Sequence, residues 1–161
     1  MKYILSTTFL ILAVHTIFAQ SKPSTMTNKV RNISISINKP ASEVYQFTSN
    51  PENFPKWVAF IKSVSKEGDI WLGKSDLGDI KIKWSPLNEF GILDHHVTLP
   101  NGETVYNPMR IISNNKGSEF IFTLFWIPGR TEKEFNEDAQ SVTKDLQKLK
   151  EKLWNRGMGL I

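Results

Sequence analysis

The chain has 161 residues, of which 40% are apolar and 22% are charged, a balance typical of one globular domain large enough to bury a core. It contains no cysteine, which excludes a disulfide scaffold, a zinc–thiolate site and cysteine catalysis. The formal net charge is +4, but the lysines and arginines are scattered along the chain, so the sequence predicts no nucleic-acid interface.

Residues 1–20 differ in composition from the rest of the chain. Lys2 is their only charged residue, and the apolar stretch that follows ends at Ala19 and Gln20. This pattern is typical of a secretory signal peptide, so we expect cleavage near Ala19 or Gln20 and a periplasmic or secreted protein without stable membrane insertion. The alternative is an uncleaved anchor, although a membrane span needs about 20 apolar residues and this stretch is shorter. Residues 21–28 are polar and predict a flexible leader.

Residues 29–156 predict one domain that opens with a strand. Residues 30–37 alternate apolar and polar side chains, as in a strand with one buried face. Two short helices are expected next. The first begins at Pro40, a residue suited to a first helical turn, and the second spans residues 52–57 after the break at Pro51.

Further strand-like segments follow, separated by turn signals. The clearest turn is Pro100-Asn101-Gly102, which predicts a hairpin between two of them. The expected strands span residues 61–66, 69–73, 79–84, 90–99, 103–113 and 118–126.

The last element is predicted to be a helix of roughly 22 residues. Thr131 and Glu134 have the spacing of a capping box, and Gly157 is expected to end the helix. One apolar stripe runs along it, formed by Phe135, Ala139, Val142, Leu146, Leu149 and Leu153.

This order of elements predicts an α+β fold. Seven antiparallel strands make a sheet too large for one helix to cover flat, so we expect the sheet to curl around the long helix. A curled sheet and a single helix leave unfilled volume between them. The order therefore predicts an apolar pocket, closed at one end by the two short helices.

Two parts of this domain carry motifs of a known superfamily. The residues concerned are the strand 33–37, Pro40-Ala41-Ser42-Glu43-Val44-Tyr45-Gln46-Phe47, Asn50-Pro51-Glu52-Asn53, Phe54-Pro55-Lys56-Trp57, and the segments 91–95 and 105–110. The opening is similar to that of the START / polyketide-cyclase / birch-pollen-allergen (SRPBCC) superfamily, and the later segments and final helix resemble its bacterial members. The resemblance covers about residues 30–155 and implies a helix-grip fold, in which the helix crosses the hollow of the sheet. It also implies binding of lipids, sterols, quinones, plant hormones or aromatic polyketides, with catalysis in only some members.

Hairpin register predicts which residues face the pocket. The expected opposite pairs are Val97 with Val105, His95 with Asn107, Leu93 with Met109, Met109 with Phe122, Asn107 with Leu124, and Val105 with Trp126. The mostly apolar face is expected to lie inward and comprises Leu93, His95, Val97, Val105, Asn107, Met109, Ile111, Phe120, Phe122, Leu124 and Trp126.

Two polar residues interrupt this inner face, His95 and Asn107. One interpretation is that they orient a ligand's carbonyl or hydroxyl, or act on it as acid and base, which makes them the candidate catalytic residues. The other, favoured because no carboxylate accompanies the histidine, is a hydrogen-bonded pair that satisfies itself within the sheet. His95 and His96 point to opposite faces of a strand and cannot share an ion, so we expect no metal site and no cofactor.

The sequence therefore predicts an exported carrier or sensor of a small hydrophobic molecule, ring-containing or lipid-like. The alternatives are a cyclase- or dehydratase-type enzyme that uses His95, and a protein-interaction module. Tyr106 and Phe125 on the outer face are candidates for a homodimer contact. The expected ligand-binding residues are Tyr45, Trp57, Trp84, Leu93, His95, Asn107, Met109, Phe122, Trp126, Val142 and Leu146.

Overall fold

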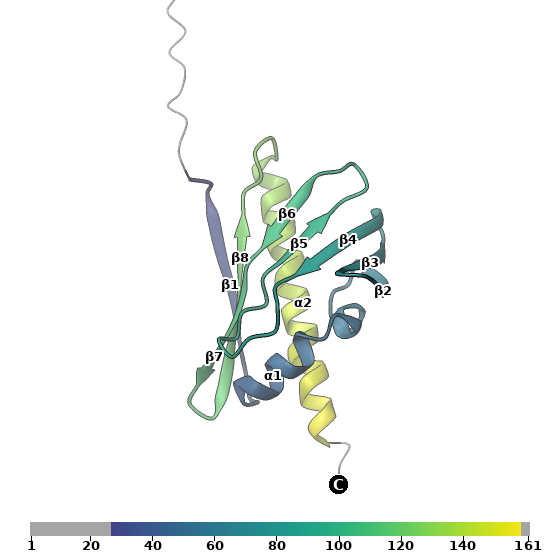
Figure 1. The fold of residues 1–161 in the computed structure, drawn as a ribbon. Coiled ribbons are helices and arrows are strands. Elements are labelled where there is room, and N and C mark those ends of the chain that lie inside the picture. Colours follow the sequence, from purple (N-terminus) through teal and green to yellow (C-terminus); the bar gives the residue numbers. More distant parts are fainter. Residues whose placement is uncertain (1–26, 159–161) are drawn as a thin grey trace, which may run out of the picture.

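The computed structural model describes residues 27–158 (Figure 1). The predicted signal peptide and most of the predicted leader lie outside these residues. The elements in chain order are β1 (Val30–Ile37), α1 (Ala41–Thr48), the 3-10 helix η1 (Pro51–Lys56), β2 (Ile61–Glu67), β3 (Ile70–Ser75), β4 (Gly78–Trp84), β5 (His95–Thr98), β6 (Thr104–Asn107), β7 (Met109–Asn114), β8 (Gly117–Phe125) and α2 (Glu132–Met158). Within this part of the chain, no helix is both long and apolar enough to cross a membrane.

The strands form two antiparallel sheets, and the prediction of a single curled sheet of seven strands is wrong. One sheet has the order β1-β8-β7 and the other the order β2-β3-β4-β5-β6. The predicted strand 103–113 is divided at Pro108, whose nitrogen carries no hydrogen for a ladder. Its first part, β6, pairs with β5, and its second part, β7, pairs with β8. The chain therefore passes from one sheet to the other at Pro108, which makes eight strands.

The predicted strand 90–99 is also shorter, because the loop before β5 has its own hydrogen bonds. The side-chain oxygen of Asn88 accepts hydrogen bonds from the backbone nitrogens of Phe90 and Ile92, each at 3.0 Å. Gly91 has a φ of +69°, and a Cβ added there would lie 2.1 Å from the carbonyl oxygen of Ile111. A glycine is required at this close approach, and the segment bends where a strand would extend.

The register confirms the predicted pairs around the hairpin and at the start of β7. The two predicted pairs that would join β6 to β8, Asn107 with Leu124 and Val105 with Trp126, do not form a ladder, because β6 pairs with β5. Leu93 precedes β5, but its backbone nitrogen donates to the carbonyl oxygen of Met109 at 3.0 Å. The confirmed pairs are Val97 with Val105, His95 with Asn107, and Met109 with Phe122.

The helices begin close to their predicted positions. Pro40 is the residue just before α1, and the second short helix is of the 3-10 type. The capping box of α2 is confirmed, because the Thr131 nitrogen donates to Glu134 Oε2 at 2.7 Å and the Glu134 nitrogen donates to Thr131 Oγ1 at 3.2 Å. α2 has 27 residues, longer than predicted, and continues past Gly157.

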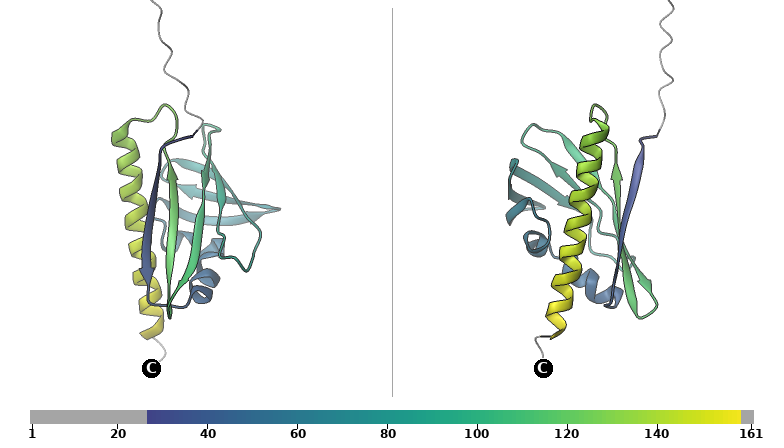
Figure 2. Two further views of the ribbon diagram at one scale, coloured as in Figure 1. Left: turned by 90° about the vertical axis from the view of Figure 1, so that its left-hand side faces the viewer. Right: turned by 180° about the vertical axis from the view of Figure 1, so that it is seen from behind.

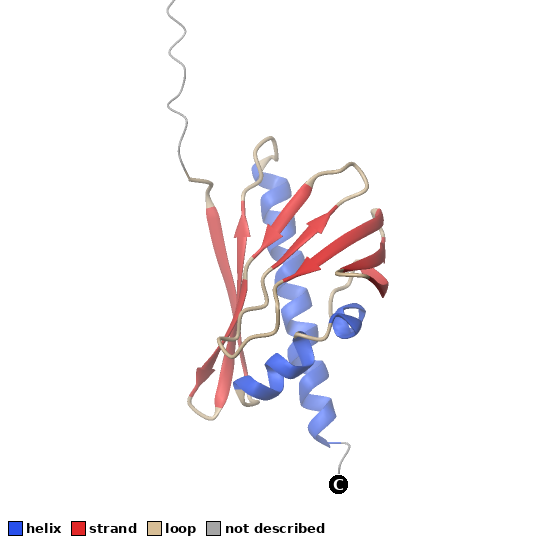
Figure 3. Cartoon of the chain, in the orientation of Figure 1, coloured by secondary structure: helices blue, strands red, loops and turns tan. Residues whose placement is uncertain are grey.

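The long helix α2 lies along the three-stranded sheet and packs mainly on β1 and β8 (Figure 2). The five-stranded sheet borders the other side of the space that α2 faces (Figure 2). α1 and η1 gather in the half of the molecule where α2 ends, which we name the closed end (Figure 3). The opposite half, with the β5–β6 and β8–α2 loops, is named the open end. Two antiparallel sheets with this C-terminal helix are consistent with a helix-grip fold.

Candidate functional site

Aromatic side chains pack together at the closed end of the space between the sheets and α2. The ring centroid of Phe54 lies 5.2 Å from Trp57, 5.1 Å from Trp84 and 5.4 Å from His95, each in an edge-on arrangement. Trp57 also contacts Phe120, with centroids 6.0 Å apart. All of these side chains except Trp84 are buried. This end is therefore a packed core.

Two hydrogen bonds connect the closed end to α2 and to the loop before β5. The side chain of Asp145 accepts a hydrogen bond from the Ala59 nitrogen at 2.9 Å, and burial raises the pKa of this carboxyl above its ordinary value. The hydroxyl of Tyr45 on α1 accepts a hydrogen bond from the Asn88 nitrogen at 2.9 Å. The predicted ligand-binding residue Tyr45 thus holds the loop in place.

Toward the open end, inward-facing apolar side chains stay accessible. The alternation of β6 and β8 places Val105, Leu124 and Trp126 on the inner face, yet each is only partly buried. Among the described residues, these three belong neither to the core cluster nor to the side chains packed against it. Val142, a residue of the apolar stripe of α2, is also partly buried, and it packs against the core cluster. Trp126 is not free of contacts, because its ring stacks on the buried Phe135 of α2 with centroids 5.1 Å apart. The partly exposed apolar side chains of Val105 and Leu124 are therefore the candidate binding surface at this end.

A row of polar and aromatic side chains marks the boundary between the two ends. Trp84, His95 and Asn107 stand opposite one another on the adjacent strands β4, β5 and β6. The rings of Trp84 and His95 are stacked, with centroids 4.3 Å apart and planes 28° apart. His95 is buried, whereas Trp84 and Asn107 are partly exposed. Two of the three side chains of the row are therefore partly accessible, although the Nε1 atom of Trp84 is itself buried.

The protonation of His95 follows from its surroundings. Its Nδ1 lies 3.2 Å from the carbonyl oxygen of Leu93, and because a carbonyl can only accept, Nδ1 carries the proton. Burial, the largest cause, lowers the pKa of His95 to about 4, against the weaker raising effects of the Leu93 carbonyl and of Asp94. The ring is therefore neutral at physiological pH, and its Nε2 offers a lone pair.

The predicted self-satisfied pair of His95 and Asn107 is not the arrangement in the structure. The two residues are opposite, as predicted, but the histidine is hydrogen-bonded to Leu93. In the part of the chain described here, four buried side-chain atoms have no hydrogen-bond partner: Trp57 Nε1, Trp84 Nε1, Ser85 Oγ and Ser118 Oγ. Two of them are indole donors of the aromatic cluster, and a native fold leaves such groups unpaired only rarely.

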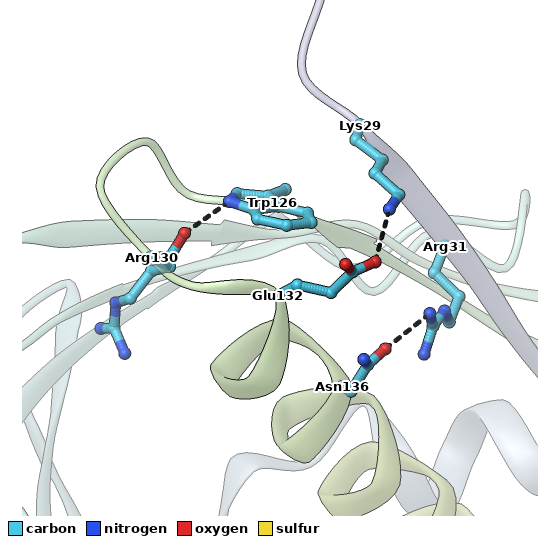
Figure 4. Close-up of polar contacts among 6 residues, drawn as sticks. All are labelled: Lys29, Arg31, Trp126, Arg130, Glu132 and Asn136. Carbon is cyan, nitrogen blue, oxygen red and sulfur yellow. Dashed lines mark hydrogen bonds and ion pairs between the residues drawn. The ribbon is translucent and has the colours of Figure 1, made fainter.

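The start of β1 is fastened to the start of α2 at the open end (Figure 4). Lys29 Nζ lies 3.3 Å from Glu132 Oε1 and 4.8 Å from the centre of the Trp126 ring. Arg31 donates to the amide oxygen of Asn136 at 2.9 Å. Trp126 in turn donates its indole hydrogen to the carbonyl oxygen of Arg130 at 2.9 Å, so its polar edge is occupied (Figure 4).

A second polar contact connects the two loops of the open end. Arg130, in the β8–α2 loop, lies 3.9 Å from Glu103, which directly precedes β6. Sequence analysis did not select either residue, nor the residues that fasten β1 to α2. Lys29 and Arg31 follow the same alternation as the inward isoleucines of β1, and that alternation was the signal available in the sequence.

The remaining predicted ligand-binding residues divide between the core and its border. Leu93, Met109 and Leu146 are fully buried in the core cluster, and Phe122 packs against it. Two surface pockets are present elsewhere, and the predicted residues line neither of them. One of about 360 Å³ lies between the end of β1 and the end of α2, and one of about 470 Å³ lies between the start of α1 and the β7–β8 turn. The list of ligand-binding residues stays a prediction.

Solved structures resemble this fold, although no protein-family model and no curated protein sequence matches the chain. Ara h 8.0201 is 13% identical, with 79% of this chain and 98% of that chain covered and a TM-score of 0.60. DynU16, from the dynemicin biosynthetic locus, is 14% identical, with 77% of this chain and 46% of that chain covered and a TM-score of 0.61. The Aha1 dimer from Colwellia psychrerythraea is 16% identical, with 78% of this chain and 96% of that chain covered and a TM-score of 0.61. At these identities the likeness shows the fold alone, which agrees with an SRPBCC-like fold.

Proposed function

We propose that the protein is an exported carrier or sensor that binds a small, largely apolar molecule between the five-stranded sheet and the first half of α2. The observation that carries the proposal is that Val105 and Leu124 face inward and yet are only partly buried. Large apolar side chains that face inward and yet stay accessible are typical of ligand sites, which are concave and mostly apolar. The fold neighbours support it, because Ara h 8.0201 is of the Bet v 1 type and DynU16 comes from a biosynthetic locus.

The polar groups around this surface fit an uncharged ligand. His95 is neutral, and the cations of the open end are engaged by Glu132, Asn136 and Glu103. A charged ligand buried here would lose hydration without gaining an unengaged counter-ion.

Binding of N-phenyl-1-naphthylamine, a neutral fluorescent probe of apolar sites, tests the proposal. We expect saturable binding to the purified protein. Leu124→Trp places a larger side chain on the inner face and should weaken binding at least about tenfold by occupying the site. Ile121→Trp is the matched control, because Ile121 lies on the outer face of the same strand and the change should leave affinity within about twofold. Absence of saturable binding, or equal losses in both variants, would contradict the proposal.

Native mass spectrometry of gently purified protein complements the probe experiment. We expect a retained small molecule whose release accompanies unfolding and whose occupancy falls in Leu124→Trp. The same protein compared between whole-cell and envelope fractions checks export. Recovery in the cytosol at its full uncleaved mass would contradict the exported location.

The cyclase- or dehydratase-type alternative receives less support from the geometry. A general base works best with a pKa near the operating pH, and burial lowers the pKa of His95 to about 4. The ring is oriented by the Leu93 carbonyl, and the carboxylate of Asp94 raises its pKa too weakly to offset the effect of burial. His95 therefore fits a hydrogen-bond acceptor better than an acid–base catalyst.

The homodimer proposal rests on an aromatic strip on the outer face. Tyr106 stacks on His96 at 4.8 Å and on Phe125 at 6.3 Å, and its hydroxyl donates to Asp94 at 2.6 Å. The ring remains 41% exposed, and a second copy could cover it. Sedimentation velocity should then show a dimer that Tyr106→Lys dissociates. A monomer at all concentrations would contradict this contact.

A further inference from the structure

The row of Trp84, His95 and Asn107 presents complementary hydrogen-bonding groups on neighbouring strands. The register places the three side chains opposite one another on the inner face. The indole of Trp84 has one donor, Nε1, and this atom is buried without a partner. The imidazole of His95 uses its Nδ1 hydrogen on Leu93, so its Nε2 can only accept.

The two rings that carry this donor and this acceptor are stacked, with centroids 4.3 Å apart. A buried donor without a partner is unfavourable, and native folds contain few such groups unless a bound molecule satisfies them. Asn107 adds an amide with both a donor and an acceptor on the open side of the histidine. The row is therefore suited to a group that accepts one hydrogen bond and donates another.

Ligand groups differ in how well they match this row. A hydroxyl accepts from the indole and donates to the imidazole, so it satisfies both rings. A carbonyl or ether oxygen only accepts and leaves Nε2 of His95 without a partner. A carboxylate also cannot donate, and no cationic side chain belongs to the row, so burial of its charge would be unfavourable.

We infer that the ligand of this protein carries a hydroxyl group, and that Trp84 and His95 bind it on the inner face of the five-stranded sheet with Asn107 beside them. The inference rests on the proposed function, since it specifies the chemistry of a molecule bound at the same surface. The apolar part of the molecule then extends over Val105 and Leu124 toward the open end.

Matched naphthalene probes separate the hydroxyl from the apolar contribution. Calorimetric titration at pH 7 compares 2-naphthol, 2-methoxynaphthalene and 2-naphthoate, which share a ring system and differ in whether the oxygen donates or carries charge. We expect 2-naphthol to bind at least about tenfold more tightly than either of the others, because a site built to pair a hydroxyl rejects analogues that leave its groups unpaired.

Variants then assign the preference to the row. Trp84→Phe removes the indole donor and keeps an aromatic ring, and it should reduce the preference for 2-naphthol over 2-methoxynaphthalene to less than about threefold. Trp154→Phe is the matched control, because Trp154 is 55% exposed near the end of α2, and it should retain the full preference. If Trp84→Phe does not fold, the probe series on the unmodified protein still decides.

The outcomes distinguish this inference from the function on which it rests. Equal affinity for 2-naphthol and 2-methoxynaphthalene would overturn the hydroxyl inference and leave ligand binding intact. Tighter binding of 2-naphthoate would also overturn it, in favour of an anion. Binding of none of the three probes, together with no binding of N-phenyl-1-naphthylamine, would overturn both.

Discussion

The closed and open ends of the space between the sheets and α2 use similar side chains in different packing. At the closed end, Phe54 contacts the rings of Trp57, Trp84 and His95, and all of these except Trp84 are buried. At the open end, Trp126 stacks on the buried Phe135, whereas Val105 and Leu124 face inward and are only partly buried. Aromatic contacts therefore continue into the open end, and the difference between the two ends lies in the aliphatic side chains of β6 and β8.

The largest expected difference between the ends is in stability. Phe54→Ala removes a ring that contacts three others and should lower the free energy of unfolding by about 3–5 kcal/mol. Leu124→Ala removes a partly exposed side chain and should cost about 1 kcal/mol. Urea unfolding followed by circular dichroism measures both. Equal losses would show that the open end is packed as tightly as the closed end.

The pH dependence of stability tests the burial of His95 at the boundary. Its pKa is about 4 in the folded protein and about 6.5 when unfolded. Between these values only the unfolded chain binds the proton, so stability is complete above about pH 6.5 and falls as the pH drops toward 4, by about 3 kcal/mol.

A histidine variant isolates this contribution from the carboxyl groups that titrate in the same range. In His95→Phe the group no longer titrates, so the difference in unfolding free energy between the two proteins should change between pH 7 and pH 4. NMR titration of the His95 ring in the intact protein gives its pKa directly. A pKa near 6.5 would mean that the ring is hydrated and that this end is more open than the contacts indicate.

Sequence periodicity predicted the elements and faces well, because the alternation of β5, β6 and β8 and the stripe of α2 are strong signals. The inward position of His95 and Asn107 followed from the hairpin turn alone. The division of the sheet did not, because Pro108 interrupts one ladder while the chain continues in the same direction. The signal in the sequence was a proline within an apparent strand. Whether such a proline divides the strand between two sheets depends on which strand pairs with the residues on each side of it.

The boundary of the packed core could not be predicted in the same way. Alternation assigns Phe120 and Leu124 to one face equally, yet only the first is buried. The difference depends on where α2 crosses the strands and where η1 packs, which are long-range properties. The partner of His95 is similarly the backbone carbonyl of Leu93, whose position depends on the loop before β5 and cannot be read from a pattern of side chains.

A smaller effect is expected from the cap of α2 at the open end. Thr131→Ala removes the side-chain oxygen that accepts from the Glu134 nitrogen and should cost about 1 kcal/mol. Thr143→Ala is the control within the same helix, since Thr143 only bonds back to the Ala139 carbonyl oxygen, and it should change stability by less than about 0.5 kcal/mol. Thermal unfolding monitored by circular dichroism distinguishes them. A larger loss in Thr143→Ala would show that the helix start does not limit stability at this end.

The smallest expected effect concerns the ion pair that fastens β1 to α2. The side chains of Lys29 and Glu132 are 57% and 69% exposed, so solvent screens their attraction. A double-mutant cycle with Lys29→Ala and Glu132→Ala should therefore give a coupling free energy below about 1 kcal/mol. This coupling should fall further with added salt. Lys29 also lies over Trp126, so its single substitution should cost more than that of Glu132. A coupling well above 1 kcal/mol, insensitive to salt, would mean that the open end is fastened as firmly as the closed end is packed. Ligand entry would then need this contact to open, and the rate of probe binding in Lys29→Ala would rise accordingly.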